Sequence, residues 1–377
     1  MSGGTMRVGI VGAGDIVRRR HMPGFARINA AAGREVVRVV AASNRSRESA
    51  ERFAAEYGFP RVYDDWRELV ASSDVDAVLV GAWPYLHAPA TLAALAAGKH
   101  VLTQARMAMN AREAKAMLDA AARSGRVAMI CPSPTGLPAD RIMRRFLDED
   151  YLGDLYAIQV RATSGTWSDP ATPFHWRLDP DISGVNTLNV GMYVEWVHRW
   201  FGPTRRISAE TRTCISERRD PATGRMRKVV HADIVLIHGE MASGVPVSYE
   251  FSGVYRGEPE GFIGAYGSKG MLRYHVGPEE GIGHLVGARD GAAIATIPLP
   301  DEAVRPWTVE ADWIEAVRTG TARPSSAEGN PSFADGLMYM DVTEAVYHGA
   351  RTRCAIELPL SEELRASPAF PPDVSRE

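Results

Sequence analysis

The chain has little cysteine and no cysteine pattern. Its 377 residues include three cysteines, Cys131, Cys214 and Cys354, which lie far apart and form no C-x-x-C pair. This scarcity argues against a disulfide framework and against a cysteine-rich metal site. We expect buried, reduced thiols and therefore a cytoplasmic protein.

An excess of charge of one sign is also missing. The formal net charge is −3, from 43 basic and 46 acidic side chains. Such a balance offers no basic surface for a nucleic acid or an anionic membrane. No apolar run approaches the length of a membrane span, and the first residues lack the basic and apolar regions of a signal peptide. We expect neither nucleic acid nor membrane as a partner.

The stretch RVGIVGAGDI, residues 7–16, is the strongest local signal. A buried strand is expected to end at Gly12, which permits a tight turn, while Gly14 lets the backbone approach a pyrophosphate. The N–H groups that open the following helix would face the phosphates. This pattern predicts dinucleotide binding, although Val17 stands where a third small residue is usual.

The second strand, expected at residues 36–42, ends in Ser43-Asn44-Arg45. An acidic residue here would bind the ribose hydroxyls of NAD and repel a 2′-phosphate. Because Asn44 is neutral and Arg45 is basic, we expect NADP or NAD as cofactor, with NADP favoured. Ser46 is expected to cap a helix that ends at Gly58. Asp65 and Asn110 are expected to cap two later helices, each with a glutamate three residues on.

Strands alternate with helices up to about residue 130, which predicts a doubly wound parallel sheet. We place an NAD(P)-binding domain at residues 1–130 and a second α/β domain at 131–377, because Pro132 and Pro134 interrupt the pattern. From residue 156 onward strand follows strand, as in a large, mostly antiparallel sheet. The expected strands are 156–162, 205–214, 229–238, 245–254, 261–266 and 292–297. A helix over 186–201 is expected to interrupt the strands.

Five segments together resemble the Gfo/Idh/MocA family, the relatives of glucose-fructose oxidoreductase and inositol dehydrogenase. They are GIVGAGDI, TLAALAAGKHVL, EDYLGDL, LNVGMY with WFG, and GAYGSKGML. The resemblance covers nearly the whole chain. It implies an N-terminal Rossmann domain, a C-terminal open sheet that often forms an oligomer interface, and nicotinamide-dependent chemistry on sugars and polyols.

The chain departs from the family at two motifs. Members usually carry Glu-Lys-Pro after the strand ending GKHVL, with lysine as the acid/base; here Gln104-Ala105-Arg106 stands there. Many members have Asp-x-Gly-x-His in the later helix, where this chain has Asn189 and Tyr193. These two residues are four apart, so we expect them on one helical face. A tyrosine at the histidine position resembles the branch with glucose-fructose oxidoreductase and dihydrodiol dehydrogenase, where it is a plausible proton donor.

Hydride transfer to or from a carbinol carbon needs an acid or a base for the hydroxyl proton. Tyr193 is our first candidate. To act as a base at neutral pH it would need a nearby cation to lower its pKa, and Arg106 or Arg177 could supply that charge. His175 is a second candidate base. We expect Glu195, on another side of the helix, to be solvated or at an interface.

The stretch Phe174-His175-Trp176-Arg177-Leu178-Asp179 combines charged and aromatic side chains, as suits a hydroxyl-rich ligand. An ordinary surface loop with an Arg-Asp pair is the alternative. His87, in the loop after the strand at 76–80, is either a ligand contact or a packing histidine. Histidine spacing predicts no metal site.

These patterns give three sets of expected site residues. The catalytic set is Tyr193 and His175. The expected substrate contacts are Trp176, Arg177, Asp179, Asn189 and Arg106. The expected cofactor contacts are Gly12, Gly14, Asp15, Ile16, Asn44, Arg45, Trp83, His87 and Gln104.

Three functions remain open at this point. The first is an NAD(P)-dependent oxidoreductase acting on a sugar or polyol, working as a dimer or tetramer through the C-terminal sheet. The second keeps the cofactor but performs a redox-neutral epimerisation, elimination or glycoside cleavage. The third is a cofactor-binding protein of low activity that lost the lysine.

Overall fold

The computed structural model describes residues 4–133, 137–277, 283–320 and 330–370. The chain divides into two compact units, Met1–Pro132 with Thr308–Leu337, and Ser133–Trp307 with Met338–Glu377. We expected one division after residue 130. The return of residues 308–337 to the first unit has no signal in the sequence pattern.

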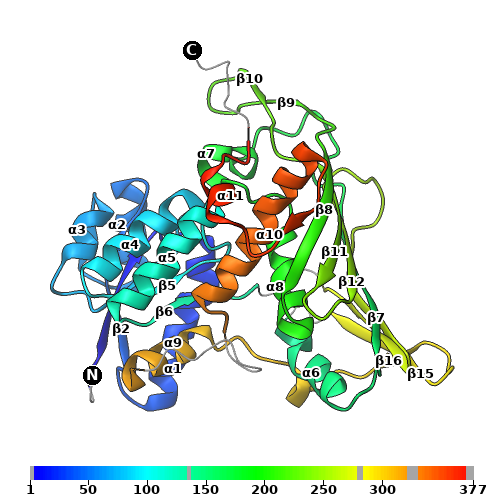
Figure 1. Ribbon diagram of the computed structural model, residues 1–377. Coiled ribbons are helices and arrows are strands. Elements are labelled where there is room, and N and C mark those ends of the chain that lie inside the picture. Colours follow the sequence, from blue (N-terminus) through cyan, green and yellow to red (C-terminus); the bar gives the residue numbers. More distant parts are fainter. Residues whose placement is uncertain (1–3, 134–136, 278–282, 321–329, 371–377) are drawn as a thin grey trace. The chain divides into compact units, whose positions relative to one another are not determined.

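The first unit contains a six-stranded, wholly parallel sheet with the order β3-β2-β1-β4-β5-β6 (Figure 1). Its strands are β1 (Met6–Val11), β2 (Val37–Ser43), β3 (Arg61–Tyr63), β4 (Ala77–Val80), β5 (His100–Thr103) and β6 (Ala128–Ile130). The strand order reverses between β1 and β4, which is where such sheets bind their ligands. The expected doubly wound sheet is confirmed.

Helices connect these strands, and their ends follow the predicted capping signals. They are η1 (Val17–His21), α1 (Met22–Ala32), α2 (Arg47–Tyr57), α3 (Trp66–Ala71), η2 (Pro84–Leu86), α4 (His87–Ala96), α5 (Ala111–Ser124) and α9 (Val309–Thr319). Ser46, Asp65 and Asn110 each accept a backbone N–H of the first turn, and Gly58 ends α2 in the left-handed conformation.

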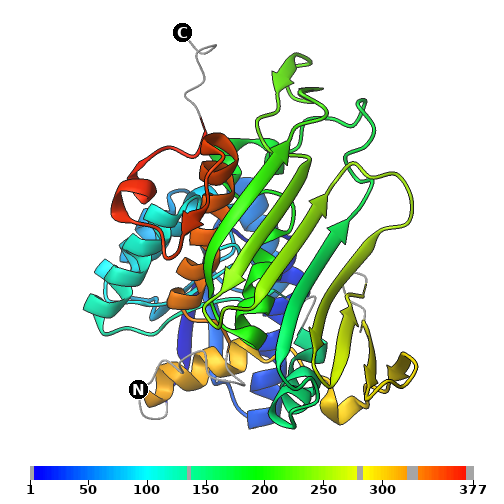
Figure 2. The same ribbon diagram turned by 45° about the vertical axis from the view of Figure 1, so that its right-hand side comes forward.

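The second unit contains a nine-stranded sheet with the order β16-β15-β14-β13-β7-β12-β11-β8-β17 (Figure 2). Only β7 and β12 pair in parallel, so the expected mostly antiparallel sheet is confirmed. The strands are β7 (Leu155–Thr163), β8 (Thr204–Arg212), β11 (Ile234–Met241), β12 (Pro246–Ser252), β13 (Glu260–Gly267), β14 (Gly270–His275), β15 (His284–Arg289), β16 (Ala295–Ile297) and β17 (Ile356–Glu357).

A separate hairpin of β9 (Glu217–Arg219) and β10 (Met226–Lys228) lies between β8 and β11 in the chain. The other helices of the unit are η3 (Leu137–Ala139), α6 (Asp140–Asp148), η4 (Trp176–Leu178), α7 (Pro180–Ser183), α8 (Val190–Phe201), η5 (Asp301–Ala303) and α11 (Glu362–Ala366). Helix α10 (Phe333–Thr352) begins in the first unit and continues into the second from Met338. We did not expect β9, β10, β14, β15 or β17. The strand expected from residue 229 begins only at Ile234.

Helix α8 is the central helix of the second unit. It begins at Val190, four residues later than predicted, and most of its residues are buried. The rings of Trp196 and Trp200 meet edge to face at 5.3 Å, and Trp200 also contacts Tyr274 of β14 at 6.2 Å. The helix is therefore packed on more than one side.

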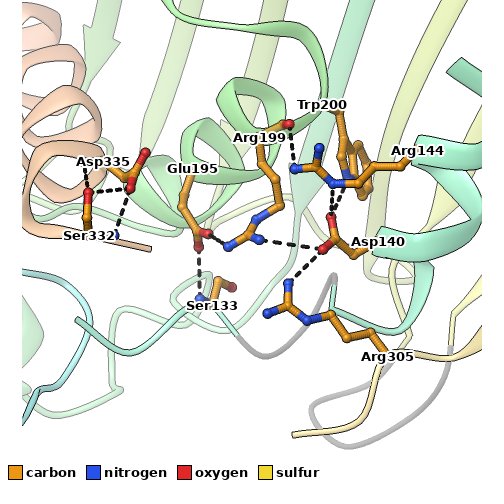
Figure 3. A network of polar contacts seen from close by, with 9 residues as sticks. All are labelled: Ser133, Asp140, Arg144, Glu195, Arg199, Trp200, Arg305, Ser332 and Asp335. Atoms are coloured by element: carbon orange, nitrogen blue, oxygen red, sulfur yellow. Dashed lines mark hydrogen bonds and ion pairs between the residues drawn. The ribbon is translucent and has the colours of Figure 1, made fainter. Parts of the chain in front are cut away.

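A buried ionic network anchors α8 (Figure 3). Asp140 is 1% exposed; it accepts from Trp200 Nε1 at 3.0 Å and from Arg305 Nη1 at 2.7 Å. Arg199 lies 3.5 Å from the same carboxylate and 3.0 Å from Glu195. Glu195 also accepts the Ser133 N–H at 2.9 Å.

Two expectations are corrected by these positions. Glu195 is 6% exposed and belongs to the network, so its assignment to a solvated or interface position was wrong. Of the three cysteines expected to be buried, only Cys131 is buried, whereas Cys214 and Cys354 are exposed.

Gly12 is predicted to be intolerant of any side chain. Its φ is +87°, and a Cβ would lie 2.4 Å from the backbone nitrogen of Ala82. Gly33 has a φ of +61° and open space around it, so a side chain there would cost only the strain of the positive φ. Gly33→Ala should lower the free energy of unfolding by about 1–2 kcal/mol, and Gly12→Ala by about 1–3 kcal/mol more. Equal losses in denaturant unfolding would contradict this.

Asp140 is predicted to contribute far more to stability than an exposed carboxylate. In Asp140→Asn the neighbouring arginines stay buried without their counter-charge, so we expect a loss of about 3–5 kcal/mol. Asp64, which pairs with Arg47 at 2.8 Å on the surface, is the control. Asp64→Asn should cost less than about 1 kcal/mol in the same urea titration. A similar loss for both variants would show that the network is not an anchor.

Candidate functional site

The carboxyl ends of β1 and β4 meet at Gly12. The missing side chain of Gly12 lets Ala82 pack against it, which explains the tight turn. Gly14 differs, because a Cβ there would meet only the Gly81 carbonyl oxygen, at 3.9 Å. The described residues therefore leave the space beside Gly14 open, as a phosphate group would require.

The residues after this turn lead into a helix. Asp15 is exposed and forms an ion pair with Arg19 at 2.7 Å. Ile16 is the N-cap of η1, a five-residue π-helix that continues into α1. π-Helical turns are frequent at functional sites, and this one directly follows the glycine turn.

The ends of β2 and β4 bring Arg45 and Trp83 together. The Arg45 guanidinium lies 5.2 Å from the centre of the Trp83 ring. Asn44 accepts the Arg45 N–H through its side-chain oxygen at 3.0 Å, which shapes the turn. The Arg45 cation and the Trp83 ring thus lie together at this edge of the sheet, where they could contact a ligand.

His87 is a buried connection between two loops. It is 1% exposed; its Nδ1 lies 2.9 Å from the Arg106 carbonyl oxygen and its Nε2 lies 2.9 Å from the Ala82 carbonyl oxygen. Burial lowers the pKa of His87. The packing role is therefore visible in the structure, and a cofactor contact of His87 stays a prediction.

Gln104, which follows β5, belongs to a buried polar cluster that the sequence analysis missed. Its side-chain nitrogen contacts Nε2 of His21, and Nδ1 of His21 lies 2.6 Å from a carboxylate oxygen of Glu310. Gln104 is 8% exposed, and His21 and Glu310 are more deeply buried. No sequence signal relates Glu310 to residue 104, because they are far apart in the chain.

In the second unit, the Tyr193 hydroxyl lies over the backbone of β13. Tyr193 is 7% exposed, its ring contacts Phe251 at 5.8 Å, and a Cβ on Gly261 would lie 2.6 Å from the hydroxyl oxygen. Gly261 thus makes room for the phenol. Burial raises the pKa of Tyr193, and the neighbouring Tyr274 adds to this effect.

Two expectations for α8 need correction. Tyr193 could act as a base only if a cation such as Arg106 or Arg177 lowered its pKa. Burial and the neighbouring Tyr274 instead raise that pKa. Asn189 was expected on one helical face with Tyr193; instead it is the exposed N-cap, before the helix begins. A substrate contact of Asn189 stays a prediction.

The loop before α7 holds the other expected residues. His175 caps η4, its Nδ1 accepting the Arg177 N–H at 3.2 Å. Burial lowers its pKa, with the Arg177 charge adding to the effect. The neutral ring therefore carries its proton on Nε2, which makes it a donor in this conformation rather than a base.

Asp179 is occupied by contacts within the protein. One carboxylate oxygen accepts the Asp181 N–H at 3.1 Å and the other pairs with Arg227 at 2.9 Å. Trp176 is half-buried beneath the exposed Arg177, at 4.5 Å. The expected Arg-Asp pair is therefore formed by Arg227, and substrate contacts of Trp176, Arg177 and Asp179 stay predictions.

Within the described part of the chain, no three histidine, cysteine, aspartate or glutamate side chains group as metal ligands would. None of the helices described there combines the length and the apolar character needed to cross a bilayer.

Comparison with known proteins agrees with this architecture. Residues 6–131 match the model of an oxidoreductase family with an NAD-binding Rossmann fold, and residues 141–273 match the GFO/IDH/MocA C-terminal domain. Among solved structures, levoglucosan dehydrogenase in complex with NADH and L-sorbose has a similar fold, with a TM-score of 0.83 at 22% identity over 94% of this chain and 99% of that one.

Curated relatives are similar in sequence. Levoglucosan dehydrogenase of Pseudarthrobacter phenanthrenivorans is 27% identical over 57% of this chain and 56% of its own length. A dTDP-3,4-didehydro-2,6-dideoxy-alpha-D-glucose 3-reductase of Streptomyces antibioticus is 28% identical over 92% of this chain and 98% of its own length. The chain spans little more than half the length of several relatives that it matches.

The six-stranded parallel sheet, the glycine turn, the open nine-stranded sheet and the two matching domain models lead to one assignment: this chain belongs to the Gfo/Idh/MocA family of NAD-binding oxidoreductases.

Proposed function

We propose that this protein transfers a hydride between a nicotinamide cofactor and a CH–OH carbon of a sugar, polyol or related carbohydrate. Family membership supports the cofactor and the reaction class, and relatives named as sugar dehydrogenases and reductases support the substrate class. The observation that carries the proposal is the buried phenol of Tyr193, held over Gly261.

The cofactor, when bound, gives or accepts the hydride, and the protein must handle the accompanying proton. A phenol with a raised pKa stays protonated at neutral pH, so Tyr193 is suited to donate a proton to a carbonyl oxygen that becomes a hydroxyl. It is poorly suited to accept one. We therefore propose that, at neutral pH, Tyr193 assists the reaction in the direction in which a carbonyl is reduced.

Tyr193→Phe should lower the rate of carbonyl reduction by about a hundredfold or more, because the proton donor is lost. Tyr249→Phe is the matched control, since Tyr249 is also buried and its ring also contacts Phe251, at 6.0 Å. The measurement is NAD(P)H absorbance with a panel of aldoses, ketoses and oxidised polyols. A Tyr193→Phe enzyme as fast as the wild type would refute the proton role.

The same assay separates the other two functions. Product formed without net consumption of NAD(P)H would indicate the redox-neutral reaction. A carbohydrate that raises the melting temperature without turnover would indicate a binding protein.

For the proposed reductase, the rate of carbonyl reduction should not fall on the alkaline side until the pH exceeds about 10, the ordinary pKa of tyrosine. The raised pKa of Tyr193 keeps the phenol protonated above that value.

We further propose that NADP(H) is preferred over NAD(H). Arg45 lies where the 2′-phosphate would approach, beside the Trp83 ring, and the neutral Asn44 replaces the acidic residue that would repel that phosphate. Gly12, Gly14, Asp15 and Ile16 would hold the pyrophosphate end. Contacts from His87 and Gln104 belong to the same proposal.

Arg45→Ala should weaken NADPH binding by about tenfold, the effect of losing one charge-assisted contact, and NADH binding by less than twofold. Arg67, which lies 4.5 Å from the Trp66 ring, forms a similar cation–π pair and is the control. Equal weakening of both cofactors in fluorescence titrations would contradict the preference.

The cytoplasmic location and a dimer or tetramer formed through the open sheet remain part of this proposal. Cross-strand ion pairs of Arg161 with Glu250 and Glu260 give one face of that sheet a polar character. Such a surface resembles the polar rim of an interface more than a core.

A further inference from the structure

A row of aromatic and cationic side chains runs along the loop between β7 and α7. The Trp167 and His175 rings are 5.5 Å apart, and the His175 and Trp176 rings are also 5.5 Å apart. The Arg177 guanidinium lies 4.5 Å from Trp176 at one end, and Arg218 lies 5.9 Å from Trp167 at the other. We call Trp167, His175 and Trp176 the aromatic row.

The loop that carries the row is held by a buried arginine. Arg218 of β9 is fully buried and donates to the carbonyl oxygens of Trp167 at 2.5 Å, Asp169 at 2.9 Å and Thr172 at 3.1 Å. One guanidinium thus holds three backbone carbonyl groups of the loop. The planar arrangement of its N–H donors suits several such contacts at once.

A small core supports the loop from the other side. Phe174, Leu178 and Val229 pack together with Trp167, and the Arg227 guanidinium lies 4.0 Å from the Phe174 ring. The β9–β10 hairpin therefore supplies both Arg218 and Arg227 to the same loop. The row is preorganised, which lowers the entropic cost of binding a ligand.

The aromatic row nevertheless remains accessible to a ligand. All three residues are half-buried rather than buried. His175 uses Nδ1 as an acceptor inside the loop, so its Nε2–H is a donor that does not stabilise η4. Indole surface beside a fixed N–H donor matches the apolar C–H face and the hydroxyl groups of a pyranose ring.

The row lies near the proposed proton donor but not at it. A Cβ on Gly253 would touch both Trp167, at 2.4 Å, and Leu188, at 3.1 Å, so these side chains meet there. The Tyr193 ring contacts Phe251 of β12 at 5.8 Å, and Gly253 follows Phe251 by two residues, roughly 7 Å along an extended chain. That separation is about the width of one sugar ring.

We propose that the aromatic row binds a second sugar ring, next to the one that is oxidised or reduced, so that the substrate is a glycoside or oligosaccharide rather than a free monosaccharide. This inference rests on the proposed function. Trp176 supplies the stacking surface, His175 donates to a ring or hydroxyl oxygen, and the exposed Arg177 leaves the Trp176 face when the sugar binds. Arg218 is a positioning residue.

The test compares disaccharides with their own monosaccharides by isothermal titration calorimetry. The probes are maltose and cellobiose against glucose, and lactose against galactose, with NADPH and, separately, NADH present. The wild type should bind at least one disaccharide about tenfold more tightly than its monosaccharide, as expected for one stacked ring. In Trp176→Ala this preference should vanish, because disaccharide affinity should fall by more than monosaccharide affinity.

The matched control is Trp66→Ala. Trp66 is also half-buried, with Arg67 over its ring at the same 4.5 Å, but it lies in the first unit. His175→Phe, which keeps an aromatic ring without the donor, should lose part of the preference. Arg218→Lys should lower the disaccharide preference without changing NADH affinity, because Lys lacks the guanidinium fork.

The inference is overturned if no disaccharide binds more tightly than its monosaccharide, or if the preference survives in Trp176→Ala. Its failure is distinguishable from that of the proposed function, which depends on turnover. If the protein reduces or oxidises a monosaccharide through Tyr193 but shows no disaccharide preference, the proposed function stands and the second sugar site is refuted.

Discussion

The second unit depends on one buried carboxylate. Asp140 connects α6 to α8 through Trp200 and Arg199, and to the segment before α9 through Arg305. Placing charges in a protein interior is unfavourable unless they are paired and hydrogen-bonded in a well-defined geometry. The network thus fixes the orientation of α8, and with it the position of Tyr193.

Much of the first unit could be predicted because its local signals agree with its fold. Its strands are buried on both faces and read as short apolar runs, and Ser46, Asp65 and Asn110 mark helix starts through hydrogen bonds within three residues. The second unit gave weaker signals. Strands β14 and β15 contain charged residues and glycine, which interrupt the apolar pattern expected of a strand. Their pairing also depends on strand context that the local sequence does not show.

Errors in the candidate site have one physical origin. Helical periodicity shows which residues share a face, but α8 is packed on more than one side, so Glu195 is buried although it lies off the expected face. The raised pKa of Tyr193 is likewise a property of its surroundings, not of its sequence neighbours. Arg218 was unpredictable for the same reason, because its partners are backbone carbonyl groups that carry no residue-type signal.

The three cysteines differ in a way that gives the protein a built-in chemical asymmetry. Burial raises the pKa of Cys131 well above its usual value, with the charge of Glu310 contributing, so its thiolate is suppressed. Cys214 and Cys354 are exposed, and both belong to the second unit. Alkylating dyes and spin labels should therefore attach to the second unit at these two cysteines and leave the buried Cys131 of the first unit unlabelled.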